Sequence, residues 1–326
     1  MAEIAKVERR KPLSLRQGDV VGVVAPASNV DRQMLETGCR ALRELGYRPF
    51  YFDSILERDL YFAGSIERRA RELEEMFLRE DVRAIVCARG GYGSNYLLGR
   101  LDLPKLAAHP KIFVGYSDVT FLLTWFVDAA GFVTFHGPMV TKDFAHADGV
   151  DLASWQAALS GVDTWMISGE ASSGLKPLVE GSAEGVLYGG CLSMLAASLG
   201  TPYEIHTEGT ILFLEDVATK PFQIDRMLMQ LKLAGKLNGV QGIVFGEMLD
   251  CIQNQNQDYT LQQVILRVVG ELGIPVAYGL KSGHVVRQNV TLPLGVRARL
   301  RVESTAVELR FLEAPTAADK SANQAS

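Results

Sequence analysis

The sequence offers few residues for a structural metal site or a disulfide framework. Its 326 residues include only four cysteines, which are scattered along the chain. No two of them have the short paired spacing that zinc sites and disulfide-rich domains use. We therefore expect neither kind of site, and four free, buried thiols at Cys39, Cys87, Cys191 and Cys251.

Long apolar runs and basic clusters are also missing. The longest apolar candidates, residues 121–127 and 186–199, are interrupted by polar or glycine residues and do not suit a membrane span. Residues 1–10 contain no apolar signal core, so we expect a cytoplasmic protein. The net charge is −5, and no basic patch is interleaved with aromatic residues. This composition argues against a nucleic-acid partner.

The first 140 residues read as an N-terminal α/β domain. The continuous apolar run 20–25 is typical of a strand buried on both faces, and residues 31–45 have helical periodicity. Further strands are expected at 48–52, 83–88 and 112–115, and a helix is expected to begin at Ser65. Strands that alternate with helices predict a parallel sheet covered on both faces.

The rest of the chain divides into three segments with different sequence patterns. Residues 141–183 have little periodicity and are interpreted as a linker. Residues 184–313 alternate apolar strands with two clear helical patterns and end in three short strands, which predicts a mixed, β-rich α/β domain. The small, polar residues 314–326 are expected to be a disordered tail.

A strand, a tight turn and a helix meet around Ser117, in the sequence GYSDV at 115–119. Such a turn exposes a serine hydroxyl and turns the next backbone N–H toward a developing oxyanion. The second glycine of the G-x-S-x-G pattern is absent here, however. Serine is also a preferred helix N-cap. Locally, the nucleophile and the cap both remain open.

A glycine-rich loop, RGGYGS at 89–94, follows the third expected strand. In a parallel sheet the carboxyl ends of the strands share one rim, so this loop is expected beside Ser117. It could donate a glycine N–H to an oxyanion, or cradle a phosphate, although it matches neither G-x-G-x-x-G nor a P-loop. It could also be a plain turn that needs positive φ.

A serine nucleophile needs a base and a group that orients the base. Of the five histidines, His284 follows a strand at an expected rim, and His136 is a rival in the first domain. Glu215 directly follows a buried strand, where a carboxylate must be paired. It could orient His284, or form a structural ion pair with Arg226 or Lys220.

Five ordered motifs then resemble those of the LD-carboxypeptidases, the serine peptidase family that also contains the microcin C immunity peptidases. The resemblance covers about residues 14–313. The motifs are VVAPAS at 23–28, ARGGYG at 88–93, VGYSD at 114–118, LFLED at 212–216 with QIDRML at 223–228, and GH at 283–284 with LPLG at 292–295.

The resemblance implies that Ser117 is the nucleophile, His284 the general base and Glu215 the residue that orients it. It also implies an oxyanion hole made by the backbone N–H groups of Gly91 and Asp118. The family joins an N-terminal α/β domain to a C-terminal domain, is commonly dimeric and needs no metal or other cofactor. Its usual activity releases the terminal D-alanine of cytoplasmic murein tetrapeptide during peptidoglycan recycling, at the bond after meso-diaminopimelate.

Alternatives remain within and outside this family. The substrate carboxylates need cationic or N–H partners, and Arg89 is a candidate by position. A microcin-immunity-like peptidase would cleave peptidyl- or aminoacyl-nucleotides and would need an aromatic platform, for which Trp155 and Trp165 are candidates. A third possibility is a module that binds a muropeptide without turnover.

Overall fold

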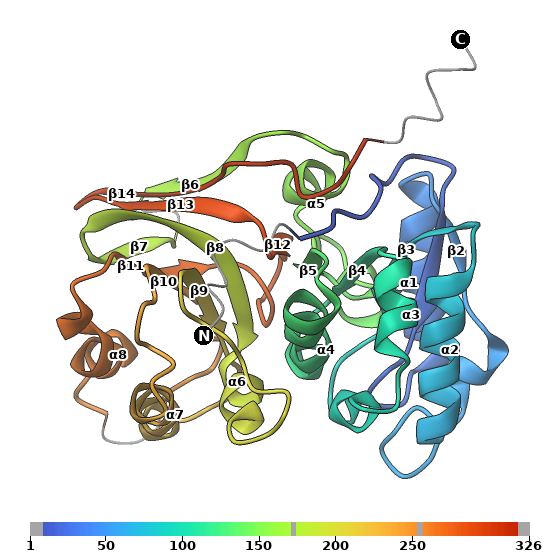
Figure 1. The fold of residues 1–326 in the computed structure, drawn as a ribbon, viewed down its shortest axis with the longest axis horizontal. Helices are drawn as coiled ribbons and strands as arrows, with labels where there is room; N and C mark the ends of the chain where they lie inside the picture. The colour runs from blue at the N-terminus through green and yellow to red at the C-terminus, as the bar shows by residue number, and fades with distance from the viewer. Residues whose placement is uncertain (1–8, 171–173, 253–256, 319–326) are drawn as a thin grey trace.

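The structure is a computed structural model that describes residues 9–170, 174–252 and 257–318. Two mixed β-sheets, each with helices packed against it, lie side by side (Figure 1). This arrangement confirms the expected α/β class with two sheet-centred halves. The apolar faces of both sheets contribute to a continuous core of buried side chains.

The N-terminal sheet has six strands in the order β12-β5-β4-β3-β1-β2. Its parallel strands are β1 (Val20–Val24), β2 (Arg48–Phe50), β3 (Val82–Cys87), β4 (Ile112–Gly115) and β5 (Thr134–His136). Its helices are α1 (Arg32–Glu44), α2 (Ile66–Leu78), α3 (Leu103–Ala108) and α4 (Thr120–Trp125). Asp31 and Ser65 cap α1 and α2 through their side chains, which explains where these helices begin.

The sixth strand of this sheet differs from the expectation. Strand β12 (Leu292–Leu294) comes from the C-terminal half of the chain, yet it pairs antiparallel with β5. The N-terminal sheet is therefore mixed rather than parallel throughout. A three-residue edge strand with a central proline carries no sequence signal for the sheet it will join.

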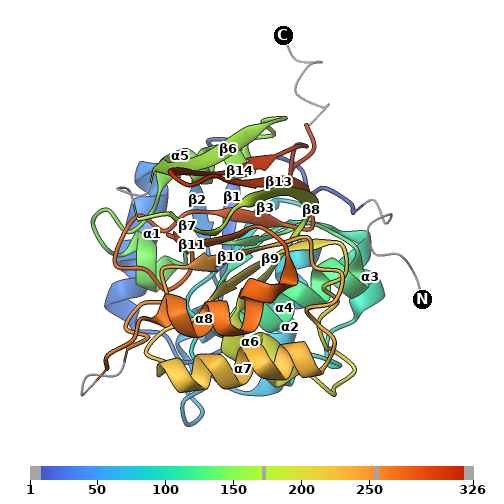
Figure 2. The same cartoon turned by 90° about the vertical axis from the view of Figure 1, so that its left-hand side faces the viewer.

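The C-terminal sheet has eight strands in the order β6-β14-β13-β8-β9-β10-β11-β7. A parallel centre consists of β8 (Gly181–Cys191), β9 (Thr210–Glu215), β10 (Gly242–Gly246) and β11 (Val276–Leu280). The antiparallel strands β7 (Lys176–Val179), β13 (Arg297–Val302), β14 (Ala306–Phe311) and β6 (Trp165–Glu170) complete it. Helices α6 (Leu192–Ser198), α7 (Pro221–Leu233) and α8 (Leu261–Val269) lie together beside this sheet, as Figure 2 shows.

Two segments are more regular than their sequences indicate. Residues 141–183, interpreted as a linker, hold helix α5 (Leu152–Leu159) and both edge strands of the C-terminal sheet. Edge strands are short and half-exposed, so their apolar periodicity is weak. In the tail, Ala317 pairs with the backbone of Pro12 and Ser14, and Thr316 is buried, so residues 314–318 are ordered. Residues 319–326 lie outside the described residues.

Two further expectations concern the four cysteines and membrane-spanning helices. All four cysteines are free and buried, as expected. Within the described ranges, no helix combines the length and the apolar character needed to cross a membrane.

Candidate active site

Ser117 is the first residue of a short 3-10 turn, Ser117–Val119, that links strand β4 to helix α4. Its φ is 64°, a left-handed conformation that non-glycine residues rarely adopt. The N-cap position of α4 is Val119, and no side chain caps that helix. The cap interpretation of Ser117 is therefore wrong, and its strained backbone turns the hydroxyl toward the C-terminal half of the molecule.

His284 and Glu215 meet Ser117 from that second half. His284 Nε2 lies 3.1 Å from Ser117 Oγ, and His284 Nδ1 lies 2.7 Å from Glu215 Oε2. The same carboxylate oxygen accepts the His284 backbone N–H at 3.1 Å. Glu215 ends the buried strand β9, and His284 follows β11, two strands flanking β10. The fold thus brings the three residues singled out from the sequence into one hydrogen-bonded chain.

Burial and charge act in opposite directions on this pair. Burial alone raises the pKa of Glu215, but the neighbouring imidazoles of His284 and His136 outweigh burial and lower it to about 2. Burial alone lowers the pKa of His284, but the Glu215 carboxylate outweighs it, so the net pKa of His284 is raised. Glu215 is therefore ionised at neutral pH, and it pairs with His284 rather than with Arg226 or Lys220.

The glycine-rich loop packs directly on the serine. A Cβ added to Gly90 would lie 2.8 Å from Ser117 Cβ, and Gly91 has a φ of 108° that favours glycine. Asp118 holds the loop because its Oδ2 accepts the Ser94 backbone N–H at 2.7 Å. Among the described residues, no protein acceptor takes the backbone N–H of Gly91 or of Asp118. The loop is therefore held against Ser117, as expected from its place after β3.

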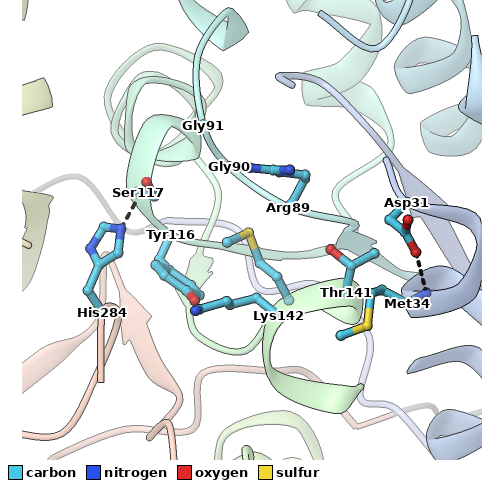
Figure 3. Close-up of a pocket in the computed structure, with 11 residues that line it drawn as sticks. Asp31, Met34, Arg89, Gly90, Gly91, Tyr116, Ser117, Thr141, Lys142 and His284 are labelled. Carbon is cyan, nitrogen blue, oxygen red and sulfur yellow. Dashed lines mark hydrogen bonds between the residues drawn. The ribbon is translucent and has the colours of Figure 1, made fainter. Parts of the chain in front are cut away.

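A pocket of about 360 Å³ opens at Ser117 and His284. Figure 3 shows these two residues at one end of the pocket, with Arg89 and Lys142 between them and the far end, where Asp31 lies. The remaining lining residues are Met34, Gly90, Gly91, Tyr116, Met139 and Thr141.

Lys142 was missed by the sequence analysis because residues 141–183 were interpreted as a linker. A signal was available: Lys142 follows shortly after β5, whose carboxyl end lies at the same rim as Ser117. Arg89, which was singled out by position, does line the pocket. The pocket therefore contains two cationic side chains close to a serine hydroxyl.

The other histidines are placed differently. His136, the rival base, is fully buried and does not reach Ser117; its Nε2 lies 3.7 Å from Glu215 Oε1. His206 is exposed beside Asp128, and His109 contacts the Lys105 carbonyl. None of these three lines the pocket at Ser117.

Cys191, Glu215 and His284 each offer one potential metal-ligating atom, and these atoms lie within 4.8 Å of one another. Burial holds the pKa of the Cys191 thiol well above its ordinary value, so the thiol stays protonated. Glu215 Oε2 already accepts two hydrogen bonds from His284. A metal would need a thiolate and a free carboxylate, so this cluster fits a hydrogen-bonded pair better than a metal site.

Comparison with known proteins adds two family matches. Residues 21–137 match the family model described as the LD-carboxypeptidase N-terminal domain, and residues 184–300 match the LD-carboxypeptidase C-terminal domain.

Individual relatives extend over nearly the whole chain. A probable murein peptide carboxypeptidase of Bacillus subtilis is 40% identical over 299 residues, which cover 91% of this chain and 93% of that protein. The microcin C7 self-immunity protein MccF of Escherichia coli is 30% identical, with 90% and 94% coverage. The crystal structure of a muramoyltetrapeptide carboxypeptidase from Oxalobacter formigenes is 31% identical, with a TM-score of 0.82 and coverage of 91% and 100%.

Proposed function

Because this chain belongs to the LD-carboxypeptidase family, we propose that it is a serine peptidase that releases the terminal D-alanine from murein tetrapeptide, at the bond after meso-diaminopimelate. The observation that carries this proposal is the hydrogen-bonded chain from Ser117 through His284 to Glu215. Peptidoglycan recycling supplies such peptides in the cytoplasm. That location, and a homodimeric state, remain predictions.

In the proposed mechanism, His284 Nε2 takes the Ser117 hydroxyl proton while Oγ attacks the carbonyl carbon that precedes D-alanine. Glu215 stabilises the imidazolium that forms, because its carboxylate accepts the Nδ1–H at 2.7 Å. The imidazolium then protonates the leaving amine, and D-alanine departs. A water molecule, deprotonated by His284, hydrolyses the acyl-enzyme and restores Ser117.

The oxyanion of each tetrahedral intermediate needs two backbone donors. We assign Gly91 N–H and Asp118 N–H to this role, since both flank Ser117 and neither is engaged by another acceptor in the described ranges. Each such donor can stabilise the transition state by about 3–4 kcal/mol.

Arg89 and Lys142 are the cations proposed to hold the substrate carboxylates, because both line the pocket that ends at Ser117. Arg89→Ala and Lys142→Ala are each expected to raise KM about tenfold or more, with a smaller change in kcat, since they bind substrate and transition state alike. The matched control is Arg40→Ala on the exposed face of α1. An unchanged KM in either variant would remove that residue from the role.

A microcin-immunity-like activity on nucleotide-linked amides is the second candidate, supported by the similarity to MccF. The aromatic platform that it needs is not formed by the two tryptophans considered from sequence. Trp155 is buried against Phe144, and Trp165 is stacked on Phe311. A binding module without turnover is the third candidate, and the Ser117–His284 hydrogen bond argues against it.

The deciding experiment is mass spectrometry of muramyl tetrapeptide incubated with the wild type and with Ser117→Ala. Loss of one alanine with the wild type alone would support both the activity and the nucleophile. If neither protein removes alanine, aminoacyl-sulfamoyl nucleotides are the next substrates to test. Labelling of Ser117 by a fluorophosphonate separates all peptidase candidates from a binding module.

A further inference from the structure

His136 makes contacts that the proposed mechanism does not use. It is fully buried at the end of β5, and its Nε2 faces Glu215 Oε1 at 3.7 Å. Within the described part of the chain, neither of these two buried atoms has a hydrogen-bond partner. Buried polar atoms are nearly always paired, because an unpaired one loses its hydration without compensation. Each atom is therefore the natural partner of the other, provided that a proton lies between them.

Ser282 shows where the protons on the His136 ring are. Its single hydroxyl proton is donated to the Val290 carbonyl at 2.8 Å, because a carbonyl can only accept. The same Oγ lies 3.0 Å from His136 Nδ1, so Nδ1 must carry a proton and donate it. With Nδ1–H fixed, Nε2 either points a lone pair at a carboxylate or carries a second proton. Only the second arrangement pairs both buried atoms and gives the carboxylate an opposite charge.

The position of His136 links the two halves of the site. In the register of the N-terminal sheet, His136 is the partner of Gly115, two residues before Ser117. Gly283, next to His284, allows the close approach: a Cβ on it would lie 2.7 Å from Glu215 Cδ and 2.8 Å from His136 Cε1. His136 is thus anchored to the sheet of the nucleophile and lies against the carboxylate of the other sheet.

We propose that His136 is a positioning residue for the reaction: as an imidazolium, it donates Nδ1–H to Ser282 Oγ and forms an ion pair with Glu215 Oε1 through its Nε2–H side. The two oxygens of Glu215 are then held separately, Oε1 by His136 and Oε2 by His284, so the carboxylate cannot rotate away from the base. This inference rests on the proposed roles of Ser117, His284 and Glu215.

The charged and titratable groups around His136 set the expected pH effects. They come from five elements or loops: Glu215 on β9, Tyr116 after β4, His284 after β11, Cys191 at the end of β8, and Asp143, behind Tyr116, after β5. Of these, only Glu215 pairs directly with His136, while His284 lies on the other side of the same carboxylate. A positive charge on His136 opposes protonation of His284, so its removal raises the pKa of His284.

The test is the rate at which a fluorophosphonate labels Ser117 as a function of pH. In His136→Phe we expect the plateau rate to fall about tenfold, since the buried Glu215 oxygen Oε1 loses its opposite charge. We also expect the acidic limb of the pH–rate profile to move to higher pH, because the pKa of His284 rises when the charge of His136 is removed. A purely structural role of His136 would not cause this shift. In His136→Gln the side-chain amide can still donate to Oε1, so the plateau rate is expected to recover while the limb stays shifted.

His206→Phe is the matched control, because His206 is exposed and pairs with Asp128 away from the pocket; its profile should equal that of the wild type. If the fluorophosphonate labels the wild type and the acidic limb of the His136→Phe profile is not shifted, the inference is overturned while the proposed function stands. If the wild type does not label at Ser117, the proposed function fails and the inference with it.

A second measurement does not depend on whether the His136 variants fold. In the wild-type protein, nitrogen-15 resonances of the His136 ring, assigned by elimination with variants at the other histidines, report both protons directly. Two protonated nitrogens at pH 7 would support the inference. A lone-pair nitrogen at Nε2 would overturn it.

Discussion

Gly90→Ala should misplace the nucleophile without replacing Ser117, His284 or Glu215. The φ of Gly90 lies outside the left-handed region, so the backbone itself accepts alanine. The new Cβ, however, would lie 2.8 Å from Ser117 Cβ and 3.0 Å from its Oγ. Carbon atoms prefer about 3.5 Å or more, so the serine must move by roughly 0.7 Å. A displacement of this size is expected to lower the labelling rate and kcat roughly 100-fold.

The same overlap should destabilise the fold by about 1–3 kcal/mol, measured by urea denaturation. Ser117→Gly removes both atoms of the overlap and suits the φ of 64° at that position. Gly90→Ala should therefore have a much smaller effect on stability in a Ser117→Gly background. Gly270→Ala is the control, because its Cβ would meet only ordinary contacts at a right-handed helical position. An equal loss of stability in both backgrounds, or labelling within twofold of the wild type, would refute this account.

Three further predictions concern the electrostatics and the loop. The acidic limb of the pH profile of kcat/KM should lie above pH 6.5, because His284 must be neutral to act as the base and its pKa is raised. Glu215→Gln removes the charge that raises this pKa, so it should move the acidic limb to lower pH and reduce kcat about 10⁴-fold. Folding lowers the pKa of Glu215 from 4.5, which adds stability above pH 4.5 that is lost on acidification. Folding raises the pKa of His284 from 6.5, which adds stability below pH 6.5 that is lost as the pH rises through the raised value. The difference in urea midpoint between the wild type and Glu215→Gln should therefore be largest between pH 4.5 and 6.5. Asp118→Ala should destabilise the protein by about 1–3 kcal/mol and slow the labelling of Ser117, because the buried Ser94 N–H loses its acceptor while the residue 118 N–H remains; an unchanged urea midpoint would show that Asp118 does not hold the loop.

Much of the site could be predicted because its residues follow strong local patterns. Ser117 and Glu215 each come at or just after the carboxyl end of a buried apolar strand, β4 in the N-terminal sheet and β9 in the C-terminal sheet. Ligands of α/β sheets bind outside such strand ends, so both positions could be singled out before their contact was known. The boundaries of β4, predicted at 112–115, are those of the structure. Sequence alone could not choose between a helix cap and a nucleophile at Ser117, because the φ of 64° that separates them is a property of the fold.

The features that sequence reasoning missed depend on contacts between distant segments. Lys142 lines the pocket only because the chain after β5 returns along the rim. The pairing of β12 with β5, and the contact of His136 with Glu215, are set by how the two halves pack. Short edge strands such as β6 and β7 have no strong apolar period, so a linker was the natural interpretation of residues 141–183.

The pairing of β12 with a strand of the N-terminal sheet has a consequence for folding during synthesis. During synthesis the serine emerges 167 residues ahead of His284, and β12 emerges after both. The edge of β5 therefore stays open until residues 292–294 have left the ribosome. A chain that stops short of residue 284 carries the nucleophile without its base. In the proposed mechanism, peptidase activity therefore begins only after residue 284 has been synthesised and has packed against Ser117.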